Sequence, residues 1–184
     1  MVNCSFSYPL VTGGAGFIGS HVIDLLLQQQ SIKKITVLEL KSANTEHLTH
    51  SNIEIIYGDI CDPLAVQKAM QGCDIVFHLA AYAKLWAKDN SIFDKINHQG
   101  TINLLSIAKQ YGIKKFIHVS SEMLLLMTTT ATVINETTEV PLKQMVGPYC
   151  KSKWLAEKAV LQAATDDFTT VIVTPAVPLS LIHI

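Results

Sequence analysis

Four glycines lie within seven residues of the stretch PLVTGGAGFIGSHVIDLLL, between an apolar strand candidate and an amphipathic helix candidate. Glycine has no Cβ atom, so a backbone rich in it can turn tightly and approach another group closely. The turn leads into a helix N-terminus, where free N–H groups and the helix dipole favour an anion such as a diphosphate. Gly14, Gly16 and Gly19 form G-x-G-x-x-G, and with Gly13 in place of Gly14 the spacing becomes G-x-x-G-x-x-G. Both spacings predict a phosphate-binding turn; an ordinary strand–turn–helix is the alternative.

An acidic residue follows this turn at the distance expected in a dinucleotide-binding unit. Glu39 ends the apolar run KKITVLEL, about 20 residues after Gly19. A carboxylate at this place hydrogen-bonds a ribose diol but repels a 2′-phosphate. All 14 basic residues are lysines, so the chain has no arginine fork for such a phosphate, although Lys41 could substitute. The sequence therefore favours NAD over NADP.

Strand and helix candidates alternate along the chain, which predicts a parallel sheet of six or seven strands with helices on both faces. The expected strands are residues 10–12, 34–39, 53–57, 74–79, 115–120 and 169–174, and the expected helices are residues 17–29, 63–71, 92–111 and 148–164. The predicted fold class is α/β, a doubly wound Rossmann domain over residues 1–178. Ligands of such sheets bind beyond the carboxyl ends of the strands.

Composition excludes several other classes of function. The chain is 49% hydrophobic with a net charge of −1, so no basic stripe suggests nucleic acid. No apolar stretch is long enough to span a membrane, and the N-terminus lacks the pattern of a signal peptide. The four cysteines show no metal-binding spacing and are interpreted as reduced thiols of a cytoplasmic protein. No metal site is expected.

A second motif lies in the stretch GPYCKSKWLAEKAV, where Tyr149 and Lys153 are four residues apart and share one face of a predicted helix. Tyrosine has a pKa near 10 and is a poor acid–base catalyst at neutral pH. A nearby ammonium would lower that pKa and make proton transfer with a hydroxyl or carbonyl feasible. Ser121, at the end of the fifth predicted strand, could hold the substrate oxygen.

Together these motifs make the chain resemble the extended short-chain dehydrogenase/reductases, also called the NAD-dependent epimerase/dehydratase family. The resemblance is closest to the dihydroflavonol-reductase-like branch, which includes hopanoid-associated sugar epimerases and lies near the 3β-hydroxysteroid dehydrogenases. It covers residues 8–178 and rests on TGGAGFIGSH, GDI at 58–60, HLAA at 78–81, INHQGTINLL at 96–105, HVSS at 118–121 and YCKSK at 149–153.

The resemblance implies a role for each matching residue. Tyr149 would be the catalytic acid/base, Lys153 its pKa partner and a ligand of the nicotinamide ribose, and Ser121 would bind the substrate oxygen. The implied NAD-binding residues are Gly13, Gly16, Phe17, Ile18 and Gly19 at the diphosphate, Glu39 at the adenosine ribose, Asp59 and Ile60 at adenine, and Leu79, Ala80 and Ala81 at the nicotinamide. A homodimer through the third and fourth long helices is a further expectation.

These observations predict NAD(P)-dependent oxidoreduction of a small molecule at a secondary alcohol or ketone. A sugar epimerase or dehydratase is the alternative among enzymes, and a non-catalytic dinucleotide-binding sensor or scaffold is the alternative of another class. Members of the family continue into a smaller substrate domain, so we expect a C-terminal truncation of this chain. Residues 179–184, LSLIHI, match the translation of a transposase-adapter sequence and are expected to be a non-native tail.

Overall fold

A six-stranded sheet with strand order β3-β2-β1-β4-β5-β6 organises the protein, and each pair of neighbouring strands is parallel. The computed structural model describes residues 6–84, 86–125, 135 and 137–176, and the predicted tail lies outside them. The strands are β1 (Pro9–Thr12), β2 (Ile35–Glu39), β3 (Ile53–Tyr57), β4 (Ile75–His78), β5 (Lys115–Val119) and β6 (Thr169–Val173). The predicted doubly wound Rossmann fold is confirmed, and the strands agree with the predicted ranges to within one residue at each end.

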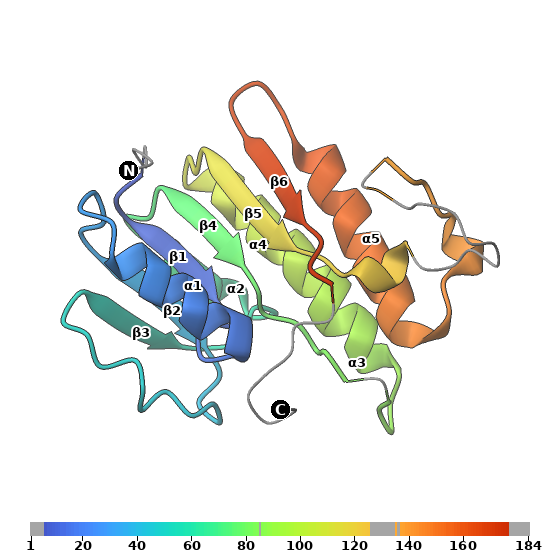
Figure 1. Cartoon of the computed structure of the whole chain (residues 1–184), viewed down its shortest axis with the longest axis horizontal. Coiled ribbons are helices and arrows are strands. Elements are labelled where there is room, and N and C mark those ends of the chain that lie inside the picture. The colour runs from blue at the N-terminus through green and yellow to red at the C-terminus, as the bar shows by residue number, and fades with distance from the viewer. Residues whose placement is uncertain (1–5, 85, 126–134, 136, 177–184) are drawn as a thin grey trace.

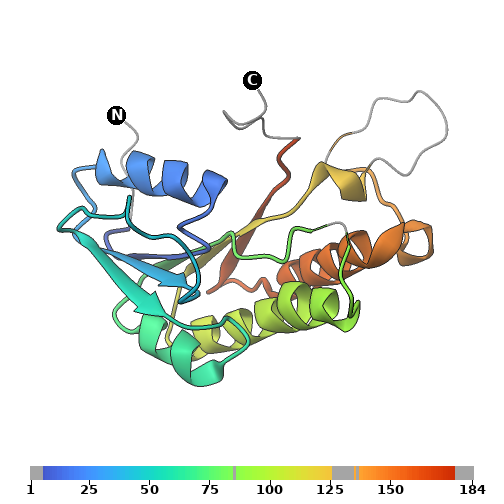
Figure 2. The ribbon, with the colours of Figure 1, turned by 90° about the horizontal axis from the view of Figure 1, so that it is seen from below.

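Helices cover the sheet in two layers (Figures 1 and 2). One face carries α1, and the opposite face carries α2, α4 and α5. The helical elements are α1 (Phe17–Leu27), α2 (Pro63–Met70), α3 (Ser91–Phe93), the π-helical turn η1 (Asp94–Gln99), α4 (Gly100–Gln110), the 3₁₀ turns η2 (Glu122–Leu124) and η3 (Leu142–Gln144), and α5 (Gly147–Ala163).

The burial of each strand follows its place in the sheet. β1 is buried at all four residues because it lies between β2 and β4. Successive side chains of a strand point to opposite faces, so Leu10 packs in the core beneath α2, α4 and α5, whereas Val11 packs in the core beneath α1. β6 lies at the sheet edge, and Val171 and Val173 are exposed on the face opposite α5 while Ile172 packs into the core.

The predicted helix over residues 92–111 differs from the structure in one turn. Near its N-terminal end, residues Asp94–Gln99 form a wider π-helical turn between α3 and α4. The reason lies in Asn97, which is 1% exposed and whose amide oxygen accepts a hydrogen bond from the Tyr82 N–H at 2.7 Å. Its amide nitrogen donates to the Ser152 hydroxyl at 3.0 Å. The turn thereby joins the loop after β4 to α5.

Candidate functional site

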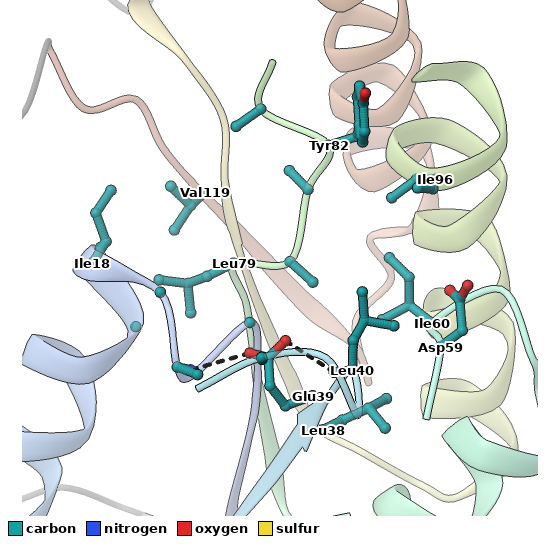
Figure 3. A pocket seen from close by; sticks show the side chains of 18 of the residues that line it. Ile18, Leu38, Glu39, Leu40, Asp59, Ile60, Leu79, Tyr82, Ile96 and Val119 are labelled. Carbon is teal, nitrogen blue, oxygen red and sulfur yellow. Dashed lines mark hydrogen bonds between the residues drawn. The ribbon is translucent and has the colours of Figure 1, made fainter. Parts of the chain in front are cut away.

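A cleft of about 760 Å³ lies at the carboxyl ends of β1, β2, β3 and β4 (Figure 3). Every residue that the sequence assigned to the cofactor, except Lys153, lines this cleft. These residues are Gly13, Gly16, Phe17, Ile18, Gly19, Glu39, Asp59, Ile60, Leu79, Ala80 and Ala81. The sheet topology thus brings together four segments that are far apart in the sequence.

The close approach of two loops explains the glycine at position 13. Gly13 has a φ of +70°, and a Cβ atom built on it would lie 2.7 Å from the Ala80 nitrogen. A Cβ atom on Gly19 would overlap the Gly13 carbonyl oxygen. Gly14 instead faces Val37 and Ile23 in the core beneath α1 and does not line the cleft. Of the two spacings in the sequence, Gly13, Gly16 and Gly19 are therefore the set that forms the cleft wall.

The Glu39 carboxylate is held between the glycine-rich turn and the end of β2. Its Oε2 accepts a hydrogen bond from the Ala15 N–H at 3.1 Å, and its Oε1 accepts one from the Leu40 N–H at 3.0 Å (Figure 3). Each oxygen of a carboxylate can accept a further hydrogen bond. The side chain is thus fixed at the cleft wall and retains acceptor capacity for a ligand.

Sequence reasoning missed several residues of the cleft wall. Leu38, Leu40 and Tyr82 flank predicted positions, so extending each motif by one residue would have found them. Ile96 reaches the cleft from η1, and no local sequence signal marks the π-helical turn that places it there. The remaining residues that were missed are Ala15, Ala43, Asn44, Gly58, Ala83 and Val119.

Ser121 and Tyr149 lie together beyond β5. Ser121 precedes η2, and its Oγ accepts a hydrogen bond from the Met123 N–H at 3.3 Å. Burial raises the pKa of Tyr149, and a hydrogen bond with the Ser121 side chain opposes that rise. The sequence predicted a lowered pKa for this tyrosine. The direction in the structure is the opposite because burial outweighs the hydrogen bond.

Lys153 is directed toward β5. Its Nζ donates a hydrogen bond to the Val119 carbonyl at 2.7 Å and lies 3.4 Å from the His118 Nε2. Burial lowers the pKa of Lys153 to about 8, against the opposing effect of the Glu157 carboxylate. Val119 itself lines the cleft, so Lys153 is anchored to a strand that contributes to the cleft wall and ends two residues before Ser121.

The neighbouring polar side chains are held by structural hydrogen bonds. The Ser120 hydroxyl donates to the Glu157 carboxylate at 2.5 Å, which ties β5 to α5. His78 is buried, with its Nδ1 2.8 Å from the Thr12 hydroxyl and its Nε2 2.9 Å from the Thr101 hydroxyl. Burial lowers the pKa of His78 to about 3, so this imidazole is neutral.

The described residues contain no metal-binding cluster, disulfide or membrane-spanning helix. No three histidine, cysteine, aspartate or glutamate side chains in that part of the chain converge on a point that could hold a metal ion. Cys61, Cys73 and Cys150 are free thiols. No helix within the same residues has the length and apolar character needed to cross a membrane.

Comparison with known proteins agrees with this geometry. Residues 10–177 match the sequence model of the 3-beta hydroxysteroid dehydrogenase/isomerase family. A Synechocystis sp. protein named for dihydroflavonol 4-reductase is 32% identical over 179 residues, which cover 97% of this chain and 50% of that protein. The chain therefore spans about half the length of the curated relatives it matches.

Two of the solved structures that share the fold illustrate the similarity. The crystal structure of gox2253 superposes with a TM-score of 0.82 at 33% identity, covering 92% of this chain and 51% of that one. The UDP-glucuronic acid 4-epimerase from Bacillus cereus, solved in complex with UDP-glucuronic acid and NAD, has a TM-score of 0.75 at 28% identity, covering 90% of this chain and 55% of the epimerase.

Proposed function

The chain belongs to the 3-beta hydroxysteroid dehydrogenase/isomerase family, and on that premise we propose that its cleft binds a nicotinamide adenine dinucleotide. The observation that carries the proposal is the close packing of Gly13 against Ala80, which leaves a backbone-lined wall beside the N-terminus of α1. Such a wall suits a diphosphate, because Gly13, Gly16 and Gly19 carry no side chain and lie beside a helix N-terminus, whose N–H groups and dipole favour an anion. The residues present therefore fit the cofactor.

Within this proposal the cofactor is NAD rather than NADP. The Glu39 carboxylate is held at the cleft wall by the Ala15 and Leu40 N–H groups, which orient it for a ribose placed beside it. A ribose diol donates hydrogen bonds to a carboxylate, whereas a 2′-phosphate is repelled by it.

In the whole protein we propose oxidoreduction at a secondary alcohol or ketone of a small molecule. A nicotinamide held in the cleft would supply or accept the hydride. During reduction the Tyr149 phenol donates its proton to the substrate oxygen, and the Ser121 hydroxyl donates a hydrogen bond to the same oxygen. The Lys153 ammonium, anchored at Val119, stabilises the phenolate that remains.

The second candidate is a sugar epimerase or dehydratase. The observation in its favour is the structural similarity to the Bacillus cereus epimerase, which carries NAD. The two activities differ in net turnover, because an oxidoreductase changes the redox state of free cofactor and an epimerase does not. A non-catalytic sensor would bind cofactor with no turnover at all. The homodimer and the second, substrate-binding domain stay predictions.

Binding of NADH to the chain, followed by cofactor fluorescence, tests the proposal directly. Gly16 precedes α1, and a Cβ atom on it would meet the Gly13 oxygen at 3.3 Å, so Gly16→Val places its side chain beside the cleft and requires a small shift of the Gly13 carbonyl. We expect saturable binding by the native chain and a loss of at least about tenfold in Gly16→Val. Gln28→Val, at the opposite end of α1, is the matched control. A folded native chain that does not bind NADH, or a Gly16→Val variant that binds it equally well, would overturn the assignment.

A further inference from the structure

Two buried side chains with basic nitrogens meet behind the cleft. His118 lies on β5 and is 1% exposed, and Lys153 lies on α5 and is 3% exposed. The Nζ of Lys153 is 3.4 Å from the Nε2 of His118 and 2.7 Å from the Val119 carbonyl oxygen. A cation in such a buried place needs acceptors around it, because burial disfavours its charged form.

The other ring nitrogen of His118 indicates which tautomer is present. An ammonium has hydrogen-bond donors and no acceptor, so Nε2 must accept and the proton must lie on Nδ1. Among the described residues, the buried Nδ1 of His118 has no hydrogen-bond partner. An unsatisfied buried N–H is unfavourable, and an apolar ring at this position would avoid it. The imidazole at position 118 is therefore explained by its other nitrogen, because Nε2 accepts the hydrogen bond from the Lys153 Nζ.

The surroundings keep this imidazole neutral. Burial, with the charge of Lys153 and the neighbouring His78, lowers the pKa of His118 well below its usual value. The rings of His78 and His118 lie 5.1 Å apart. A neutral imidazole is able to accept a hydrogen bond from an ammonium, whereas a protonated one is not.

We propose that His118 is a positioning residue, whose Nε2 holds the charged Lys153 side chain against the end of β5. An ammonium has three N–H bonds. Two of them are directed to His118 and to the Val119 carbonyl, so the third is left for a ligand or for Tyr149. The role of His118 toward a bound cofactor rests on the proposed function, whereas its contact with Lys153 is independent of that function.

Other titratable groups lie on α5 itself, on η1, which packs against α5, and on β4. Glu157, on the same helix, favours the charged amine. On η1, Asp94 and His98 pair with each other at 2.9 Å. The charge of Lys153 also lowers the pKa of His78 on β4, and Tyr149 lies one helical turn before Lys153 on α5.

A titration of the Lys153 side chain tests the proposal without any cofactor. Protein labelled with ¹³C at the lysine Cε is followed by NMR, and the Lys153 signal is assigned from its absence in Lys153→Met. We expect a midpoint near 8 in the native chain, as the lowered pKa of Lys153 requires. His118→Phe removes the acceptor and should lower that midpoint by about one pH unit, because a hydrogen bond to a charged group is lost.

Two variants separate positioning from packing. His118→Gln offers an amide oxygen in place of Nε2 and should bring the midpoint back toward the native value. Phe116→Leu changes a fully buried residue on the same face of β5 but removes no hydrogen-bond partner of Nζ, so it should leave the midpoint unchanged. If His118→Phe does not fold, His118→Leu replaces it, with the same expected shift.

The pH dependence of NADH affinity is the second readout. Affinity should fall as the pH rises through the Lys153 midpoint, and in His118→Phe the fall should come at a lower pH. If no folded variant binds NADH at any pH, the proposed function fails while the NMR titration still decides the role of His118. An unchanged midpoint in His118→Phe, or His118→Gln behaving like His118→Phe, would overturn the proposal.

Discussion

The Ala80 nitrogen lies so close to Gly13 that a Cβ atom built on this glycine would sit 2.7 Å from it. The contact joins the loop after β1 to the loop after β4, and both loops line the cleft. A displacement of either backbone would move both walls of the cleft together.

We expect Gly13→Ala to lower the free energy of unfolding by about 3 kcal/mol, because a left-handed conformation and a backbone overlap act together. Gly72 provides the matched control, since its φ is +74° and a Cβ atom on it would meet nothing within 4 Å. Gly72→Ala should lower the free energy of unfolding by only about 1 kcal/mol. Urea denaturation of both variants checks the difference, and equal losses would show that the contact with Ala80 contributes nothing.

Glu39→Gln should change the preference for the cofactor. The substitution keeps an acceptor but removes the negative charge, so the ratio of NADPH affinity to NADH affinity should rise about tenfold. Glu54→Gln makes the same change at the exposed Lys34–Glu54 ion pair, away from the cleft, and should leave the ratio unchanged. Fluorescence titration of each variant with NADH and with NADPH measures this affinity ratio. If the affinity ratio rose equally in Glu39→Gln and Glu54→Gln, the change would come from the net charge of the protein and not from the position of Glu39.

Tyr149→Phe should abolish turnover and leave NADH affinity nearly intact. Loss of a general acid typically lowers the rate by 10²–10⁴-fold, whereas the phenol does not line the cofactor cleft. The measurement is NADH oxidation with a panel of ketones, with NADH affinity determined in parallel. A matched fall in affinity and turnover would remove Tyr149 from the proton-transfer step.

Stability should depend on the protonation of Lys153. Its pKa is lowered from 10.5 to about 8 on folding, so between these two values the unfolded state binds more protons than the folded state. The contribution of Lys153 to the free energy of unfolding therefore rises with pH across this window, by about 3 kcal/mol.

The thiols of Cys61 and Cys73 act in the opposite sense, because burial raises the pKa of each to about 11. The test is therefore the difference in free energy of unfolding between the native chain and Lys153→Met, measured by urea denaturation from pH 7 to pH 11. Lys153→Met should be the more stable protein at pH 7 and lose that advantage as the pH rises. Parallel pH curves for the two proteins would contradict a buried amine with a lowered pKa.

Local sequence patterns were sufficient for the fold and for the motif residues of the cleft wall, but not for Ile96. The order of strands and helices follows from hydrophobic periodicity, and Gly13 and Glu39 follow from motif spacing. The contact of Lys153 with His118 was not predictable in this way, because it depends on how α5 packs over β5. The raised pKa of Tyr149 likewise reflects burial by residues distant in the sequence. The π-helical turn at Asn97 is set by hydrogen bonds to Tyr82 and Ser152, which no local propensity encodes.

β6 lies at one edge of the sheet, with Val171 and Val173 exposed. Within the residues that the structure describes, no strand pairs with its outer edge, and an unpaired edge with apolar side chains readily pairs with a strand of another molecule. We therefore expect the chain to aggregate as its concentration is raised, at temperatures where each molecule is still folded. Light scattering, rather than a melting curve, will define the concentration range in which the titrations above report on single molecules.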